Sequence, residues 1–274
     1  MEEYHTISKT TDRQRIDMVE MYESGLSTIE IGKKFNTTSA NAYGIIKRRG
    51  VKMRSRSEAN RKYVINEHFF DRIDSAEKSY FLGILFADGC NILSRFEVSI
   101  GLAKYDKEIL EKLGSLIYTD RPLWKRPNRF VLTIVNKHIS QQLNKLGCVP
   151  RKTFKLKYPH YLPLELRRHF IRGYFDGDGS IYKRKNGQFY LSITSTEHMC
   201  KGIQQTIFEH TSIVPRIRKR NNVYELGQGG NIKVKCITDW LYNDATIFMK
   251  RKHDRYLQLV DYCEHRLSSH HINL

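Results

Sequence analysis

Cysteines are few in this sequence and follow no pattern. Five are spread along the chain and no two form a CxxC pair: Cys90, Cys148, Cys200, Cys236 and Cys263. An odd, scattered set argues against a disulfide framework and a structural zinc site, and it is typical of a reducing compartment. We therefore expect free, buried thiols and a cytoplasmic, organellar or phage-encoded protein.

Long apolar runs are also absent. The longest, residues 80–87, contains Gly83 and ends at Asp88, far short of the ~20 residues that a membrane helix needs. The opening residues, MEEYHTISKT, are acidic and polar, unlike a secretion signal. We expect no membrane partner.

Acidic residues are scarce beside basic ones. The 274 residues include 47 Lys and Arg against 29 Asp and Glu, a formal net charge of +18. Such an excess favours a polyanionic partner. Hydrophobic residues make up 40% of the chain, so it can fold around a core, and its length suits more than one module.

The first fifty residues predict three helices. One fits residues 13–23, Ser27 and Glu30 have capping-box spacing for the second, and Thr38 is a candidate cap for a third that ends near Arg49. Two helices joined by a short turn resemble a helix-turn-helix, and we place this domain at residues 1–51. Its outward candidates for DNA contact are Ser39, Asn41, Tyr43, Lys47 and Arg48. The alternative is a plain three-helix bundle without a partner.

A basic linker follows at residues 52–65. Serine, asparagine and glycine are mixed there with basic residues, and no apolar periodicity is visible. Arg54 and Arg56 are candidates for contacts with DNA phosphates. The alternative is a solvated tether.

The rest of the chain alternates helix and strand patterns, and the order repeats. Residues 92–100 read as one strand and 129–135 as another, with helical spacing at 106–118. We assign residues 66–158 to a first repeat and 159–274 to a second. The predicted class is α+β, two pseudo-symmetric halves preceded by a small all-α domain.

The repeat is clearest in YFLGILFADG, residues 80–89, and FIRGYFDGDG, residues 170–179, which align without gaps at an offset of 90 residues. In each copy two small residues stand four apart on one helix face: Gly83 with Ala87, and Gly173 with Gly177. Small residues allow two helix backbones to approach closely. We expect the two helices to pack on these faces and Gly89 and Gly179 to adopt positive φ.

This packing brings together two carboxylates, Asp88 and Asp178, at helix C-termini, where the macrodipole disfavours negative charge. A divalent cation would relieve the repulsion, since carboxylate and carbonyl oxygens are the ligands that Mg²⁺ prefers. Candidate metal ligands are the two acids and the carbonyls of Ala87 and Gly177, with Mn²⁺ as a possible substitute for Mg²⁺. The alternative for a single copy is an ordinary helix end.

FLGILFADG and IRGYFDGDG resemble the paired signature helices of the LAGLIDADG homing endonucleases, in the single-chain form with two repeats. The resemblance covers residues 66–265. It implies an αββαββα unit per repeat, a saddle of antiparallel strands on DNA, metal acids at Asp88 and Asp178, and Mg²⁺-dependent cleavage of both strands with 3′ overhangs. It also implies a late lysine in each repeat, for which Lys152 and Lys252 are the nearest matches; their alternative is a phosphate contact or a surface charge. The chain departs from the motif at Phe86, Arg172 and Asp176, which suggests asymmetric helix packing.

Two hairpins of the second repeat carry basic clusters. As residues of a DNA-binding sheet they would contact phosphates and base edges, and the alternative is edge-strand charge that prevents aggregation. The candidates are Lys183, Arg184, Lys185, Arg216, Arg218, Lys219 and Arg220.

The predicted function is therefore that of a site-specific DNA endonuclease of the intron-homing, mobile-element type, which acts on double-stranded DNA as a monomer; an intron and a free-standing gene stay open as its source. Two alternatives stay open on the same scaffold: a DNA-binding regulator that does not cut, and an RNA maturase.

Overall fold

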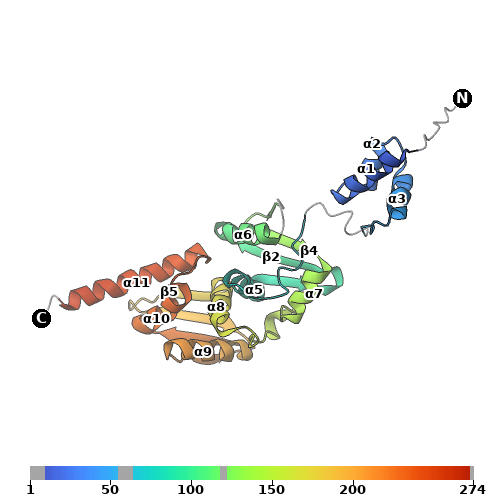
Figure 1. Cartoon of the computed structure of the whole chain (residues 1–274). Coiled ribbons are helices and arrows are strands. Elements are labelled where there is room, and N and C mark those ends of the chain that lie inside the picture. Colours follow the sequence, from blue (N-terminus) through green and yellow to red (C-terminus); the bar gives the residue numbers. More distant parts are fainter. Residues whose placement is uncertain (1–9, 55–63, 118–121, 272–274) are drawn as a thin grey trace. The chain divides into compact units, whose positions relative to one another are not determined.

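The chain divides into two units, residues 1–64 and 65–274. A computed structural model describes residues 10–54, 64–117 and 122–271 (Figure 1). None of the helices in these ranges is long and apolar enough to cross a bilayer.

Within residues 10–54, the described part of the N-terminal unit, the chain forms three short helices: α1 (Asp12–Glu23), α2 (Thr28–Lys34) and α3 (Ser39–Arg48). Ser27 caps α2 in a capping box with Glu30, as predicted. Thr38 accepts a hydrogen bond from the third amide of α3, which satisfies a donor that the helix leaves unpaired. The buried core consists of Met18, Tyr22, Ile31, Ala42, Ile45 and Ile46.

The second unit contains two halves with the same αββαββα order, which confirms the predicted fold class. The first half comprises α5 (Ala76–Asp88), β1 (Gly89–Ile92), β2 (Glu97–Ala103), α6 (Lys107–Ile117), β3 (Trp124–Lys125), β4 (Arg129–Val135) and α7 (Lys137–Lys145). The second comprises α8 (Leu164–Asp178), β5 (Gly179–Lys183), β6 (Phe189–Ser195), α9 (Glu197–Thr211), β7 (Arg216–Arg220), β8 (Val223–Gly229) and α10 (Asn231–Tyr242). The helix α11 (Lys250–His271) follows.

Each half folds into a four-stranded antiparallel sheet. The strand orders, β1-β2-β4-β3 and β5-β6-β8-β7, are the same in both halves. Helices α6 and α7 pack on the first sheet, and α9 and α10 pack on the second. The single strand predicted at residues 92–100 was wrong, because a 3₁₀ turn at Leu93–Arg95 and a left-handed Phe96 (φ 50°) separate β1 from β2.

Helices α5 and α8 lie side by side at the centre of this unit (Figure 1). Their contact is the predicted one, made by glycines. A Cβ added at Gly83 would overlap the carbonyl oxygen of Phe170, and one at Gly173 would overlap that of Tyr80. The two backbones therefore touch, and any larger residue at either position would separate them.

The glycines that follow these helices have a different role from the predicted one. Gly89 (φ −74°) and Gly179 (φ −82°) are extended, not left-handed. A Cβ at Gly89 would lie 2.5 Å from the Leu85 carbonyl oxygen, and one at Gly179 would overlap the Phe175 ring. Space, not backbone conformation, requires glycine at both positions.

The pairing of the two helices is asymmetric, as the departures from the motif suggested. Asp176 is fully buried in α8 and accepts hydrogen bonds from the Tyr80 hydroxyl (2.7 Å), the Tyr242 hydroxyl (2.6 Å) and the Met249 amide (2.7 Å). One turn earlier, the buried Arg172 donates to the carbonyl oxygens of Ile247 and Leu241.

The equivalent of Asp176 in α5 is Phe86, which packs edge-on against Phe170 with ring centroids 5.2 Å apart. One half is thus held by a polar network and the other by aromatic packing. Because every oxygen of the Asp176 carboxylate is engaged inside the protein, this acid has a structural role.

The thiol prediction was partly wrong. No disulfide joins any of the five cysteines, all of which lie in the described ranges; Cys148, Cys200 and Cys263 are buried, whereas Cys90 and Cys236 are exposed.

Candidate active site and nucleic-acid interface

The two predicted acids end the central helices. Asp88 is the last residue of α5 and Asp178 the last residue of α8. The α8 end approaches Asp88 closely, because a Cβ at Gly177 would lie 2.7 Å from the Asp88 Oδ2 atom. The contact between α5 and α8 at Gly83 and Gly173, called the glycine seam below, therefore places one carboxylate from each half close to the other.

The surroundings of this pair disfavour negative charge. Partial burial and then the charge of Asp178 raise the pKa of Asp88 to about 6. Burial also raises the pKa of Asp178, although Lys152, a hydrogen bond from Tyr174 and Lys252 act in the opposite direction. Two acids that repel one another at dipole-negative helix ends form a place where a cation stabilises the fold.

Both predicted lysines lie beside these acids. The Lys152 ammonium donates a 2.7 Å hydrogen bond to the carbonyl of Ala87, and that of Lys252 donates to the carbonyl of Gly179. Lys252 is 7% exposed, and this burial, with the nearby Arg251, lowers its pKa to about 8. The two lysines are not symmetry-equivalent, because one holds the carbonyl before an acid and the other holds the carbonyl after one.

Two residues at this place had escaped the sequence analysis. Arg251 Nε donates to Asp106 Oδ2 at 2.9 Å, and its Nη2 lies 3.3 Å from the Asp176 carbonyl oxygen. Asp106, which precedes α6, is 3% exposed, and its Oδ1 has no hydrogen-bond partner among the described residues. At the repeat offset of 90 residues, the equivalent of Asp106 in the second half is Thr196, which caps a helix in the usual way. The sequence therefore gave no sign that Asp106 lies beside the two acids.

The acids fit a divalent cation better than the neighbouring carbonyls do. The carboxylates of Asp88 and Asp178 are hard oxygen donors with excess negative charge, which suits Mg²⁺. The carbonyl of Ala87, in contrast, already accepts from the Lys152 ammonium. A cation here would therefore rely on the carboxylates first.

The open face of the second sheet is basic. Side chains alternate along a strand, so Arg216, Arg218 and Arg220 of β7 share one face. Their register partners on β8, such as Glu225 opposite Arg218, lie on the same face. This face contains a hollow of about 550 Å³. Its lining includes four basic residues, Arg184, Arg216, Arg218 and Lys233, together with Tyr190, Gly227 and Gly229.

Aromatic stacking orders part of this face. The Arg184 guanidinium lies 4.0 Å from the centroid of the Tyr190 ring, and the Tyr190 hydroxyl donates to Glu225 (3.1 Å). Lys185 is exposed in the adjoining loop.

Two of the predicted basic residues lie elsewhere. Lys183 and Lys219 have the opposite alternation and belong to the helix-covered face. The Lys183 ammonium lies 4.1 Å from the ring centroid of Tyr262, a residue of α11. Both lysines are exposed at the sheet margin. They are separated from the open face of Arg216, Arg218 and Arg220 by the alternation of side chains along the strands and not by burial.

The first sheet contributes residues that the sequence analysis missed. Trp124 is 60% exposed, with the Arg126 guanidinium 5.6 Å from its ring centroid. Arg129 is exposed at the start of the neighbouring strand β4. An exposed tryptophan beside arginines is suited to stacking and phosphate contacts.

In the N-terminal unit, Tyr43 and Lys47 are exposed along α3, with the ammonium 5.8 Å from the ring centroid. Arg48 is also exposed and donates to the Gly44 carbonyl. Ser39 and Asn41 are half-buried and hydrogen-bond to Thr28 and Thr37, respectively.

Arg54 folds back onto its own unit. It stacks on Tyr22 at 4.2 Å and donates to the carbonyls of Gly25 and Leu26. Its guanidinium is therefore engaged in structure and not presented to a phosphate. Arg56 lies outside the described residues.

Comparisons with known proteins found similarities to parts of this chain. Residues 165–243, from α8 through α10, match the model of the LAGLIDADG-like domain family. Over 172 residues the chain is 29% identical to a protein described as a probable translation initiation factor IF-2 of Methanocaldococcus jannaschii, and the match covers 57% of this chain but 14% of that protein.

Solved structures with a similar arrangement include two homing endonucleases. The I-LtrWI LAGLIDADG homing endonuclease bound to target DNA is 14% identical, with a TM-score of 0.45 over 71% of this chain and 90% of that one. I-SmaMI bound to cleaved DNA is 14% identical, with a TM-score of 0.47 over the same shares. The full-length DUF199/WhiA protein of Thermatoga maritima is also 14% identical, with a TM-score of 0.46 over 76% and 71%. The similarity to the LAGLIDADG-like domain family extends over residues 165–243 of this chain.

Proposed function

We propose that this chain is a site-specific endonuclease that hydrolyses both strands of duplex DNA with a divalent metal, as a monomer. The observation that supports this most directly is the meeting of Asp88 and Asp178 at the ends of two helices in backbone contact, with Lys152 and Lys252 beside them. The resemblance to homing endonucleases adds the expectation of 3′ overhangs.

The chemistry needs a cation and a proton carrier. Asp88 and Asp178 would hold Mg²⁺, or Mn²⁺ in its place, and the carbonyls of Ala87 and Gly177 are the further proposed ligands. The ion would supply stabilisation of the negative charge that develops on a phosphodiester during hydrolysis. Lys252, with a pKa of about 8, can gain or lose a proton near neutral pH.

DNA would lie across the open faces of the two sheets. On the second sheet the proposed contacts are Arg184, Lys185, Arg216, Arg218 and Arg220. The N-terminal unit would add contacts as a helix-turn-helix, through Ser39, Asn41, Tyr43, Lys47 and Arg48. Phosphate contacts would set the affinity, and side chains that reach base edges would set the target.

The test is selection of cleaved sites from a random duplex library in the presence of Mg²⁺, followed by cleavage of the selected duplex. Asp88→Asn combined with Asp178→Asn should bind this duplex but leave it intact, because the cation loses both acids. Glu111→Gln, an exposed acid of α6, is the control and should cut normally.

Binding of duplex DNA without cleavage by the unaltered chain would instead favour a regulator. Tighter binding of structured RNA than of any duplex would favour a maturase. Translation initiation is not proposed, because the matched segment is 14% of the factor's length.

A further inference from the structure

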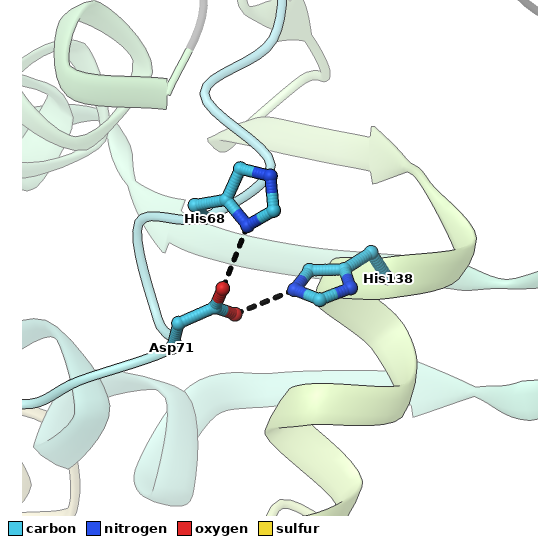
Figure 2. Close-up of side chains that lie close together, drawn as sticks. All are labelled: His68, Asp71 and His138. Atoms are coloured by element: carbon cyan, nitrogen blue, oxygen red, sulfur yellow. Dashed lines mark hydrogen bonds and ion pairs between the residues drawn. The ribbon is translucent and has the colours of Figure 1, made fainter.

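A second group of possible metal ligands lies apart from the acid pair. His68 and Asp71 belong to the segment 65–74, through which the chain enters the second unit, and His138 lies in the first turn of α7. Figure 2 shows the two imidazole rings next to each other, each facing one oxygen of the Asp71 carboxylate. His68 Nδ1 lies 2.7 Å from Asp71 Oδ2, and His138 Nε2 lies 2.5 Å from Asp71 Oδ1.

The ligand atoms are close enough to share one ion. One nitrogen from each ring and one carboxylate oxygen lie within 4.8 Å of one another. In a tetrahedral zinc site, with bonds of about 2.0–2.2 Å, ligand atoms stand about 3.3 Å apart. Small rotations of the exposed side chains would open the two short hydrogen bonds to this spacing.

The chemistry of the donors separates this cluster from the catalytic acids. Two imidazoles with one carboxylate suit Zn²⁺ and neighbouring transition metals, whereas an all-oxygen pair such as Asp88 with Asp178 suits Mg²⁺. The two places would therefore take different ions from the same solution.

We propose that His68, Asp71 and His138 bind one Zn²⁺ or similar transition-metal ion, which joins segment 65–74 to α7. Each imidazole must turn a lone pair toward the ion, so a proton on that nitrogen moves to the other ring nitrogen or to solvent. All three residues are exposed, so water completes the tetrahedron.

The position of the cluster gives this ion a structural effect. Segment 65–74 is already attached by the Asn66 amide, which donates to the Ile117 carbonyl (2.8 Å), and by the buried rings of Phe69 and Phe70. A bound ion would add a bond between this segment and the sheet-covering helix α7. It would fix the segment through which the chain enters the second unit.

The test uses the full chain carrying Asp88→Asn and Asp178→Asn, so that the proposed catalytic metal site is removed and the result does not depend on nuclease activity. After chelator treatment, Co²⁺ should bind one per chain with the intense visible absorption of a tetrahedral site, and Zn²⁺ should displace it. His68→Gln or His138→Gln should each weaken Co²⁺ binding more than tenfold.

The matched control is His265→Gln. His265 also faces a carboxylate, Asp261, one turn away (3.1 Å), and its replacement should leave the spectrum unchanged. Because a variant could also fail through misfolding, hydrogen exchange of the chain without cluster substitutions gives a second reading: Zn²⁺ should slow exchange in residues 65–74. Co²⁺ spectra that persist in both histidine variants, or exchange that Zn²⁺ does not slow, would overturn the proposal.

Discussion

At the scale of single residues, the proposed catalytic pair is a source of instability. Asp88 and Asp178 stand at helix ends that disfavour negative charge, and burial and mutual repulsion raise the pKa of Asp88 to about 6. The fold tolerates this arrangement because the glycine seam fixes the helices independently of the acids. The same carboxylates that oppose folding are the ones that would hold a cation.

Removing one of these charges should stabilise the protein. A pKa raised in the folded state means that folding is favoured while the acid is protonated and is weakened as the pH rises through about 6. Without divalent cations, Asp88→Asn should therefore be more stable than the unaltered chain at pH 7 by roughly 1 kcal/mol, discounted for solvent screening.

In a thermal scan this difference corresponds to a Tm higher by about 2–4 °C. The gain should shrink as the pH falls toward 4. A gain that is the same at pH 4 and pH 7 would show that repulsion is not its cause.

Lys252 should control the pH dependence of cleavage. Its pKa of about 8 lies in the assay range because burial disfavours the ammonium. Lys252→Ala should lower the cleavage rate about 100-fold or more and remove a transition near pH 8 from the rate profile. Unchanged binding of the duplex serves as the control, and a retained transition would assign it to another group.

At the scale of helices and strands, the sequence predicted what local chemistry determines. The caps Ser27 and Thr38 and the helix ends at Asp88 and Asp178 depend on residues within one turn, so they could be found in advance. The break at Phe96 could not, because a left-handed aromatic residue is imposed by the strand pairing around it. The positions of Lys183 and Lys219 also required the register, since a basic cluster does not reveal which side chains share a face.

The seam between α5 and α8 should not accept a methyl group. At Gly173 a Cβ would overlap the Tyr80 backbone, so Gly173→Ala should destabilise the fold by about 3 kcal/mol or more through forced separation of the helices. Gly101→Ala, whose Cβ would meet its nearest neighbour at an ordinary 3.5 Å, should change stability by less than about 0.5 kcal/mol. Urea unfolding of both variants measures the contrast.

Neighbouring basic residues of β7 should differ in their effect on DNA binding. Arg218 lies on the open face and Lys219 on the other. Arg218→Ala should reduce the slope of log K against log salt by about 0.9, the value for one phosphate contact, whereas Lys219→Ala should leave the slope unchanged. Equal effects would mean that net charge alone determines binding.

At the scale of the whole molecule, the repeat at an offset of 90 residues was enough to predict two similar halves and the approach of Asp178 to Asp88. Their asymmetry was not predictable in detail. Phe86 and Asp176 occupy equivalent positions, but the partners of Asp176, including Tyr242 and Met249, come from distant parts of the chain. Asp106 of the first half likewise accepts a hydrogen bond from Arg251, which follows the second half. No sequence pattern around either residue predicts this contact.

Because each half contributes one acid, we expect Asp88 and Asp178 to act on different strands of the DNA. If each acid acts mainly on the nearer strand, Asp88→Asn and Asp178→Asn alone should both slow complete cleavage and accumulate nicked duplex. Labelling each strand separately should show opposite strands left intact in the two variants. The same strand intact in both would mean that the acids act as one unit.

The main-chain contact between α5 and α8 also affects how such a chain can evolve. At its closest points this interface is made by main-chain atoms and depends on Gly83 and Gly173, whereas a few side-chain pairs, such as Tyr80 with Asp176 and Phe86 with Phe170, complete it. The outer strands of either half can then accumulate substitutions, and so acquire new preferences, without disturbing the fit to the other half.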